Sequence, residues 1–449
     1  MSESPPSIAR FMLRGGSIAL LSRVVALPAG LAVQMLMARL IPPEHLGAYF
    51  LTQSLVIVLG NLSSLGIPQP LSRLLAQRVG RGDRGGSRAV LGSGLRIVVA
   101  SVSGLALLYA GVGDWLAERL FESPVMASGT LVAAAWLAGS GLQGACTSAI
   151  SGFHQVGLAS WLLGPIISLF MLVTLGALML WSGESDFHTI VLLSAAGTWV
   201  NLAVCGVILW SNVRGATPRP GGDTARTLLM SGFPVLGSAL LNTPLLQADL
   251  WIVGALMPGE VALYGAAKRL IRLVGLPLVI VGQVVPPLVA DLYAKGEFDR
   301  VQRGVRGAAT LAGLPALLAL GFIMIAAESI LSLVFGDFYG SAGLLARILC
   351  LERIIFVLVG PASVLLMMTG HESVLFRIQL WSGLLWIAAI TAGGAFAGAP
   401  GVAVGYTASS AIRETWILIE ARRRTGIQAQ FNPFHVASMV EALRRAARR

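Results

Sequence analysis

The stretch from residue 158 to residue 181 reads LASWLLGPIISLFMLVTLGALMLW and contains no charged side chain. A helix needs roughly 20 apolar residues to cross the hydrocarbon of a bilayer, so this stretch is long enough to span a membrane. Similar stretches lie at about 17–40, 47–67, 90–112, 125–150, 188–211, 228–256, 261–289, 308–333, 342–369, 375–397 and 401–420. The sequence therefore predicts an all-α integral membrane protein with about twelve transmembrane helices.

The composition of the whole chain agrees with this prediction. Hydrophobic residues make up 55% of the 449 residues and charged residues only 12%, and the mean hydropathy is +0.79. A soluble domain carries roughly 25% charged residues. The chain contains no Walker motif, Rossmann glycine pattern, nucleophile elbow or HExxH motif, and its three cysteines lie singly in apolar stretches. We therefore expect no enzyme, no cofactor and no metal site.

The net charge of +11 comes mainly from short segments between the apolar stretches, which argues against nucleic-acid binding. Alternate segments are basic, and they include Arg73, Arg78, Arg81, Arg84 and Arg88, then Arg214, Arg219 and Arg226, then Lys295, Arg300, Arg303 and Arg306, then the arginines after residue 420. The other segments carry mainly acidic residues, namely Glu44, Asp114, Glu118, Glu122, Glu184, Asp186, Glu260 and Asp337. By the positive-inside rule, both termini are cytoplasmic and the number of spans is even. The predicted location is a bacterial inner membrane, crossed many times.

Two parts of the chain resemble each other. LIPPEHLGAY at 40–49 matches LMPGEVALY at 256–264, and AQRVGRGD at 76–83 matches ADLYAKGE at 290–297. Both matches need an offset near 215 residues. We therefore predict a six-helix lobe over 1–215, a second over 216–420 and a basic tail over 421–449, which either forms an amphipathic helix on the inner leaflet or is disordered. Parallel repeats of this kind occur in transporters that bind substrate between two lobes.

Short motifs in both halves resemble one family. They are ARLIPPE at 38–44, LGAY at 46–49, LGI at 65–67, DLWIVG at 249–254, YGAAKRL at 264–270, FGDFY at 335–339 and GH at 370–371. Together they resemble the polysaccharide-transport branch of the multidrug/oligosaccharidyl-lipid/polysaccharide flippase superfamily. The resemblance implies two six-helix bundles around a central cavity. It also implies flipping of an isoprenoid-pyrophosphate-linked glycan, for O-antigen or exopolysaccharide, alongside polysaccharide polymerase machinery.

Ionisable residues within apolar stretches are candidates for substrate contact, because burying a charge in a membrane is costly. Arginine suits the pyrophosphate of a lipid-linked glycan through its forked donors and permanent charge. In the first half, Arg23 and Gln34 share one helical face, and Asn61 lies in the second stretch. Arg23 either lines the cavity or extends to the cytoplasmic headgroups. In the second half, we expect substrate contacts from a set in the eighth stretch, namely Lys268, Arg269, Arg272 and Gln283.

Acidic residues in the apolar stretches have other predicted roles. Asp249 lies seven residues after Asn242 and on the same helical face. It either pairs with Arg269 or Arg272, or binds a coupling H⁺ or Na⁺. The neighbouring pairs Glu352–Arg353 and Arg413–Glu414 are expected to form structural ion pairs with another span.

Two alternatives to glycan flipping remain from the sequence. One is a cation-coupled exporter of drugs or small solutes with the same architecture, and the other is a lipid II flippase, whose relatives usually have more spans. The basic residues at 268–272 favour an anionic substrate over a cationic drug. The sequence does not identify the glycan, the coupling ion or the oligomeric state.

Overall fold

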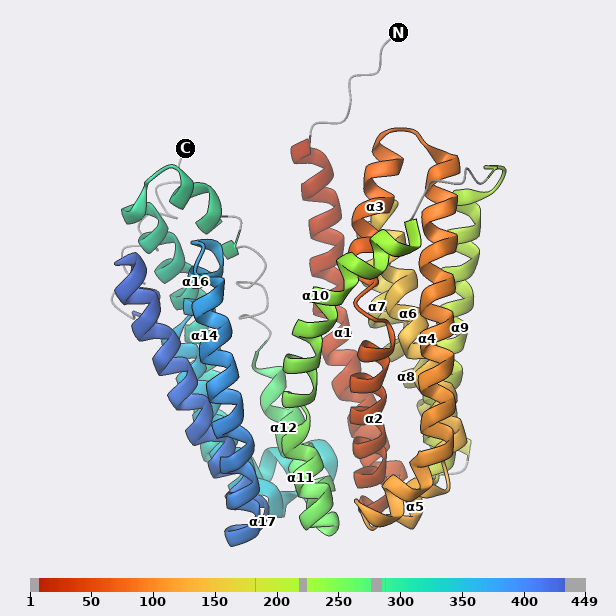
Figure 1. Ribbon diagram of the computed structural model, residues 1–449. Helices are drawn as coiled ribbons and strands as arrows, with labels where there is room; N and C mark the ends of the chain where they lie inside the picture. Colours follow the sequence, from red (N-terminus) through yellow and green to blue (C-terminus); the bar gives the residue numbers. More distant parts are fainter. Residues whose placement is uncertain (1–7, 182, 218–223, 276–284, 287, 433–449) are drawn as a thin grey trace. The chain divides into compact units, whose positions relative to one another are not determined.

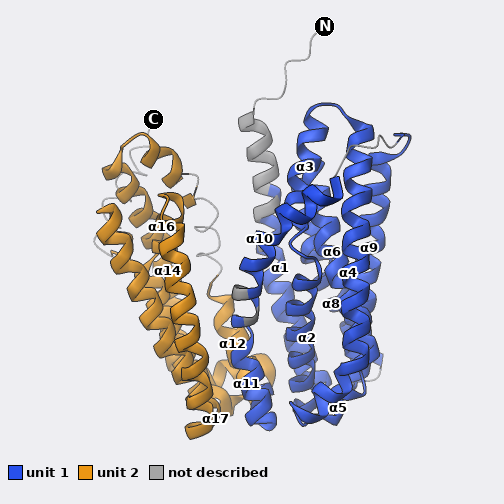
Figure 2. Cartoon of the chain, in the orientation of Figure 1, with its two compact units in different colours: residues 1–262 blue, residues 263–449 orange. Residues whose placement is uncertain are grey.

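The computed structural model describes residues 8–181, 183–217, 224–275, 285–286 and 288–432 (Figure 1). All regular secondary structure in these ranges is helical. The chain divides into two compact units, residues 1–262 and 263–449 (Figure 2), and each is described by itself. The predicted boundary between two repeats at 215/216 stays a prediction.

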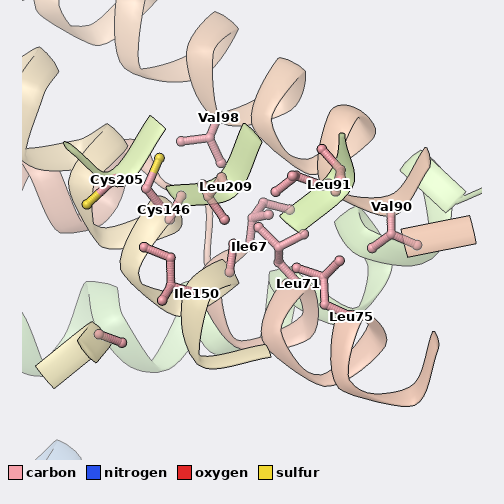
Figure 3. Close-up of a cluster of buried hydrophobic side chains, with 14 of the residues drawn as sticks. Ile67, Leu71, Leu75, Val90, Leu91, Val98, Cys146, Ile150, Cys205 and Leu209 are labelled. Atoms are coloured by element: carbon pink, nitrogen blue, oxygen red, sulfur yellow. The ribbon is translucent and has the colours of Figure 1, made fainter. Parts of the chain in front are cut away.

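Unit 1 contains eleven described helices and one 3-10 turn. The helices are α1 (Ile8–Leu40), α2 (Pro43–Ser63), α3 (Pro68–Gly80), α4 (Arg84–Arg119), α5 (Pro124–Ala127), α6 (Thr130–Gly152), α7 (Val156–Leu163), α8 (Pro165–Trp181), α9 (Phe187–Val213), α10 (Thr224–Leu245) and α11 (Ala248–Leu256), and the turn is η1 (Pro258–Glu260). Helix α6 packs against α2, α3, α4 and α9, while α1 packs against α7 and α8. Leu71 and Leu75 of α3 meet Ile150 of α6 and Leu209 of α9 in a buried hydrophobic core (Figure 3).

The arginine-rich segment after residue 67 is not the loop that hydropathy predicts. Helix α3 begins at Pro68. The ring of proline fixes its φ at a value that suits the first turn of a helix. Leu71 and Leu75 are buried one turn apart, while Arg73 is exposed. A helix with one narrow apolar face has too few apolar residues to stand out in a hydropathy scan. The next helix, α4, is capped by Asp83, which accepts a hydrogen bond from the Gly86 backbone N–H at 2.8 Å.

The acidic loops of unit 1 gather at one end. Ser185 N–H donates to the Leu40 carbonyl at 2.9 Å, and Phe187 N–H donates to His45 Nδ1 at 3.3 Å. Asp186 caps α9, and its hydrogen bonds with Thr189 lower the pKa of this carboxyl. The segments around residues 40–45 and 183–187 are therefore neighbours, as expected for loops on the same side of a membrane.

Two basic segments of unit 1, around residues 84–88 and 212–216, share the opposite end with the uncharged segment around Gln155. Arg88 Nη1 donates to the Ala216 carbonyl, and its guanidinium lies 6.0 Å from the centre of the Trp210 ring. Gln155 Nε2 donates to Asn212 Oδ1 at 3.1 Å. Because α2, α4 and α9 run between the two ends, the loops that differ in charge lie at opposite ends of unit 1.

The fifth apolar stretch, quoted above, is broken at Gly164. This residue has φ −154° and ψ −54°, and Pro165 has no N–H to donate, so carbonyl groups in the preceding turn lose their helical partners. The Leu162 carbonyl accepts hydrogen bonds from Gln143 Nε2 at 3.0 Å and from Asn201 Nδ2 at 2.7 Å. Helices α6 and α9 thereby supply hydrogen-bond donors at the interruption between α7 and α8.

Unit 2 contains two long described helices and several shorter ones. Its described elements are the part of α12 (Val261–Leu273) from residue 263 onward, α14 (Phe298–Phe335), η2 (Asp337–Ala342), α15 (Gly343–Val359), α16 (Ala362–Met368) and α17 (Glu372–Thr425). Helix α17 packs against α15 and α16, and α14 packs against α15. Non-helical dihedral angles at Ala397 and Gly398 divide α17 in two, which agrees with the predicted spans 375–397 and 401–420.

The second pair of repeated motifs forms the same local structure twice. Gly82 has φ +70° and precedes the cap residue Asp83 of α4. Gly296 has φ +74° and precedes the cap residue Glu297 of α14. A positive φ is readily adopted by glycine, which explains the matching glycines in the two motifs.

Among the described residues, six helices are long and apolar enough to cross a membrane, or seven if α15 and α16 form one bent span. The predicted number of about twelve spans stays a prediction. Most of the predicted eighth span and the tail from residue 433 lie outside the described residues.

Candidate functional site

Five charged side chains within the apolar helices of unit 2 form what we call the charge cluster. They are Lys268 of α12, Glu352 and Arg353 of α15, and Arg413 and Glu414 of α17. The Glu352 side chain is only 5% exposed, and the charges of the other four side chains all act on it. Three helices thus bring together groups that lie far apart in the sequence.

The direct ion pairs in this cluster join sequence neighbours. Arg353 Nε lies 3.6 Å from Glu352 Oε2, and Arg413 Nη2 lies 3.0 Å from Glu414 Oε1. Arg413 Nη2 also lies within 3.4 Å of the Ser410 hydroxyl oxygen. The expected interaction with another span is present as electrostatic interaction of Glu352 with Lys268 of α12 and with Arg413 and Glu414 of α17.

Aromatic rings accompany the basic side chains. Lys268 Nζ lies 6.0 Å from the centre of the Tyr406 ring, and Tyr406 packs edge-to-face against Trp386 with ring centres 5.8 Å apart. The Arg353 guanidinium lies 5.2 Å from the Phe356 ring. The negative face of an aromatic ring stabilises a cation in surroundings of low polarity.

The charges of this cluster do not sum to zero. Three basic and two acidic side chains leave one excess positive charge when all five are ionised. In addition, Arg353 Nε is buried and makes no hydrogen bond within the described part of the chain. An excess positive charge among apolar helices favours the approach of an anion.

The structure separates the basic residues predicted in the eighth span. Lys268 is half-buried and interacts with Glu352 and Tyr406. Arg269 is also half-buried, and its Nη1 donates to the carbonyl of Gly265 on the same helix at 3.3 Å. Arg272 is exposed. Gln283 lies outside the described residues.

Asp249 is fully buried in α11, in unit 1. The arginines proposed as its partners belong to unit 2, so that pairing and the alternative of a coupling ion stay predictions. Asn242 lies in α10, but the structure describes only its backbone. Beside Asp249 on α11, Trp251 Nε1 donates to the Ser54 hydroxyl of α2 at 2.8 Å.

The predicted site residues of the first half lie on two helices. Arg23 and Gln34 belong to α1, and the structure describes only the backbone of Arg23. Gln34 Oε1 is buried without a hydrogen-bond partner within the described residues. Asn61 of α2 is exposed and lines a pocket.

This pocket has a volume of about 280 Å³ and lies between α2, α6 and α7. We call it the hydroxyl pocket, because serine and threonine dominate its lining. It is lined by Gly60, Asn61, Ser64, Pro68, Ser140, Gly141, Gly144, Thr147, Ser148, Ser151, Ala159, Ser160 and Leu163. The α6 members recur every three or four residues from 140 to 151, a one-face pattern that hydropathy does not detect.

The comparisons with known proteins agree with the membrane fold. The chain matches an inward-facing multidrug resistance MATE family transporter of the MOP superfamily with a TM-score of 0.77 and 14% identity, covering 91% of this chain and 98% of that one. It matches an outward-facing structure of a MATE family transporter with a TM-score of 0.62 at the same identity, covering 94% and 99%. The fold is that of the MOP superfamily, so the chain is a multi-pass integral membrane protein.

The sequence itself identifies the family. Residues 12–293, more than half of the chain, match the family described as polysaccharide biosynthesis protein. The chain belongs to this family, as the motifs predicted. A search of curated proteins gives no match. The chain also matches a MOP superfamily transporter from Pyrococcus furiosus with a TM-score of 0.63 and 14% identity, covering 94% of this chain and 99% of that one; that protein is described as having a binding pocket of reversed polarity that suggests a different function.

Proposed function

We propose that this protein flips an isoprenoid-pyrophosphate-linked oligosaccharide from the inner to the outer leaflet of a bacterial inner membrane. Two six-helix lobes, 1–215 and 216–420, alternately open the substrate site to the two sides of the membrane. Family membership places the protein in polysaccharide biosynthesis, and the MOP fold occurs in transporters. A transporter in such a pathway acts on a glycan intermediate that is made on one side of the membrane and used on the other.

The observation that carries this proposal is the excess positive charge of the charge cluster. A pyrophosphate is an anion, so the excess positive charge of the cluster stabilises it more than it stabilises a neutral or cationic solute. Lys268, beside the Tyr406 ring, supplies a positive charge from α12 to a cluster otherwise formed by α15 and α17. An approaching pyrophosphate offsets the repulsion between the three cations.

The polarity of the cluster also separates this proposal from drug export. A cationic drug requires acidic groups in excess, whereas here basic groups are in excess. The similar Pyrococcus furiosus transporter is described as having a binding pocket of reversed polarity that suggests a different function. Export of cationic drugs is the alternative that the following experiment distinguishes.

We expect Lys268→Met to reduce flipping at least tenfold, because methionine keeps the length of the side chain but removes the charge from the cluster. The measurement uses proteoliposomes that contain a fluorescent isoprenyl-pyrophosphate disaccharide, and dithionite bleaches the outer-leaflet fluorophore. Arg269→Ala and Arg272→Ala test the neighbouring predicted contacts in the same assay. Lys295→Met is the matched control, because Lys295 is exposed and pairs with Asp291 at 2.7 Å.

Equal flipping by the wild type and Lys268→Met would contradict the role of the charge cluster. Protein level and elution as a single species must match the wild type before rates are compared. Drug efflux by the wild type, with no flipping of the disaccharide, would instead support the exporter alternative.

Orientation in the membrane gives a second expectation. A reporter inserted at residue 186 should lie in the periplasm, and one inserted at residue 300 should lie in the cytoplasm, because the first segment is acidic and the second basic. Alkaline phosphatase is active only in the periplasm, and green fluorescent protein fluoresces there poorly after export by the general secretory route. Activity in the reverse pattern would overturn the orientation without affecting the fold.

A further inference from the structure

The hydroxyl pocket of unit 1 has no charged side chain in its lining. Its volume of about 280 Å³ lies near the lower limit of ligand pockets, roughly 300 Å³. Three helices contribute polar side chains to the lining. Examples are Asn61 from α2, Ser148 from α6 and Ser160 from α7. A polar concavity among apolar helices suits a polar ligand, because such a ligand supplies hydrogen-bond partners that lipid does not.

The hydrogen bonds of the lining show which kind of polar ligand fits. Ser64 donates to the Asn61 carbonyl at 2.7 Å, and Thr147 donates to the Gln143 carbonyl at 2.9 Å. Ser151 and Ser160 likewise donate to carbonyls of their own helices. A hydroxyl has one proton and two lone pairs. While these four hydroxyls donate to the carbonyls, their lone pairs stay available to accept hydrogen bonds from a ligand.

Because four of the six hydroxyls in the lining offer lone pairs, the pocket favours ligands that donate hydrogen bonds. Carboxylates and fully ionised phosphates only accept hydrogen bonds, so they do not match the lone pairs of these four hydroxyls. A sugar ring has several O–H donors on its edges and C–H groups on its faces. The apolar side chains of Pro68, Ala159 and Leu163 complete the lining. Asn61 adds an amide that both donates and accepts.

We propose that the hydroxyl pocket binds an uncharged sugar ring, and that it accepts hydrogen bonds from the hydroxyl or amide N–H groups of that ring. If the proposed function holds, this ring belongs to the glycan of the lipid-linked substrate. The pocket then distinguishes glycans by the donor groups of one residue, whereas the charge cluster recognises the pyrophosphate that all such substrates share.

The walls of this pocket are held in place by contacts between the helices that form it. The α7 wall ends at the Leu162 carbonyl, which is fixed by the amides of Gln143 and Asn201. On the α2 side, a Cβ added at Gly141 would lie 2.6 Å from Ser63 Oγ, so α2 and α6 approach closely there. The pocket is thus bounded by closely packed backbones.

The test uses methyl α-glucopyranoside and its tetra-O-methyl derivative, which has a similar ring but no O–H donor. Saturation-transfer NMR measures their binding to the full-length protein in lipid nanodiscs. We expect the glucoside to bind saturably and the methylated derivative to bind at least tenfold more weakly. Asn61→Leu combined with Thr147→Val should weaken glucoside binding roughly tenfold, because acceptors are replaced by side chains of similar size.

Ser148→Ala is a milder second variant, should the double variant fold poorly, and it should weaken binding by a smaller factor. Ser211→Ala is the matched control, because Ser211 donates to the Ile208 carbonyl of its own helix but lies outside the pocket. Equal binding of the two probes, no saturable binding to the wild type, or binding unaffected by the pocket variants would each overturn the proposal.

Two further measurements distinguish failure of the sugar pocket from failure of the proposed flippase function. Binding of inorganic pyrophosphate should depend on Lys268 and be unchanged by the pocket variants. Flipping of the lipid-linked disaccharide without glucoside binding would refute the sugar pocket and leave the flippase proposal standing. Glucoside binding without flipping would support the pocket and contradict the proposed function.

Discussion

Glu352→Ala is expected to lower the free energy of unfolding by roughly 3–5 kcal/mol, the usual effect of removing one partner of a buried ion pair. Glu352 is 5% exposed, and its carboxylate lies among the basic side chains Lys268, Arg353 and Arg413. Without this carboxylate, the charge cluster would contain three basic side chains and one acidic side chain, Glu414. The midpoint of denaturation in a detergent series, or the melting temperature of the purified protein, measures the change.

A double variant shows whether the charge itself is responsible. Glu352→Gln should destabilise the protein, and Glu352→Gln combined with Arg353→Gln should recover part of the loss, because the unpaired charge is removed as well. Glu328→Ala is the control, since Glu328 pairs with Arg347 at 3.0 Å but its side chain is 62% exposed. This exposed pair should contribute less than about 1 kcal/mol. Similar losses for Glu328→Ala and Glu352→Ala would contradict the importance of burial.

Gly66→Ala is expected to prevent accumulation of folded protein. Gly66 has φ +68°, a conformation that costs a non-glycine residue roughly 1–3 kcal/mol. An added Cβ would also overlap the Gly232 carbonyl oxygen and lie 2.7 Å from the Leu236 backbone nitrogen, both on α10. Backbone atoms cannot move aside as a flexible side chain can, so the corner between α2 and α3 would separate from α10. Fluorescence-detected size exclusion of tagged protein measures the loss.

Gly82→Ala isolates the conformational part of this effect. Gly82 has φ +70°, almost the same as Gly66, but a Cβ there would meet nothing within 4 Å. Gly104→Ala, at a helical glycine with open space around it, should be neutral or slightly stabilising. We expect the order of damage to be Gly66, then Gly82, then Gly104. Equal accumulation of the Gly66 and Gly82 variants would show that the contact with α10 does not matter.

The helices of this protein were largely predictable because lipid-spanning segments have a simple composition. The stretch at 188–211 became α9 (Phe187–Val213), and the division of the last helix near residue 398 agrees with two predicted spans. Helix α3 was missed because it is short and buries only one narrow face. The interruption at Gly164 was missed because an apolar run continues through it, and hydropathy does not register backbone geometry.

The candidate site was harder to predict, because its members come from distant segments. The sequence marks Lys268 and the pairs Glu352–Arg353 and Arg413–Glu414, but it does not reveal that they act on one another. Nor does it indicate Tyr406 as the neighbour of Lys268. Arg272, in contrast, is exposed, although it lies only four residues beyond Lys268 on the same helix. Tertiary packing decides which of several adjacent cations is buried.

The carbonyl of Leu162 also has a consequence for the order in which the protein is assembled. Its two amide donors lie on α6, which is synthesised before it, and on α9, which is synthesised after it. Lipid offers no hydrogen-bond donor to an exposed carbonyl. Before α9 has been made, Gln143 is present to donate a hydrogen bond to the Leu162 carbonyl, but Asn201 is not. The insertion of Asn201 therefore completes this region, and a nascent chain released before residue 201 leaves its fifth apolar segment unfinished.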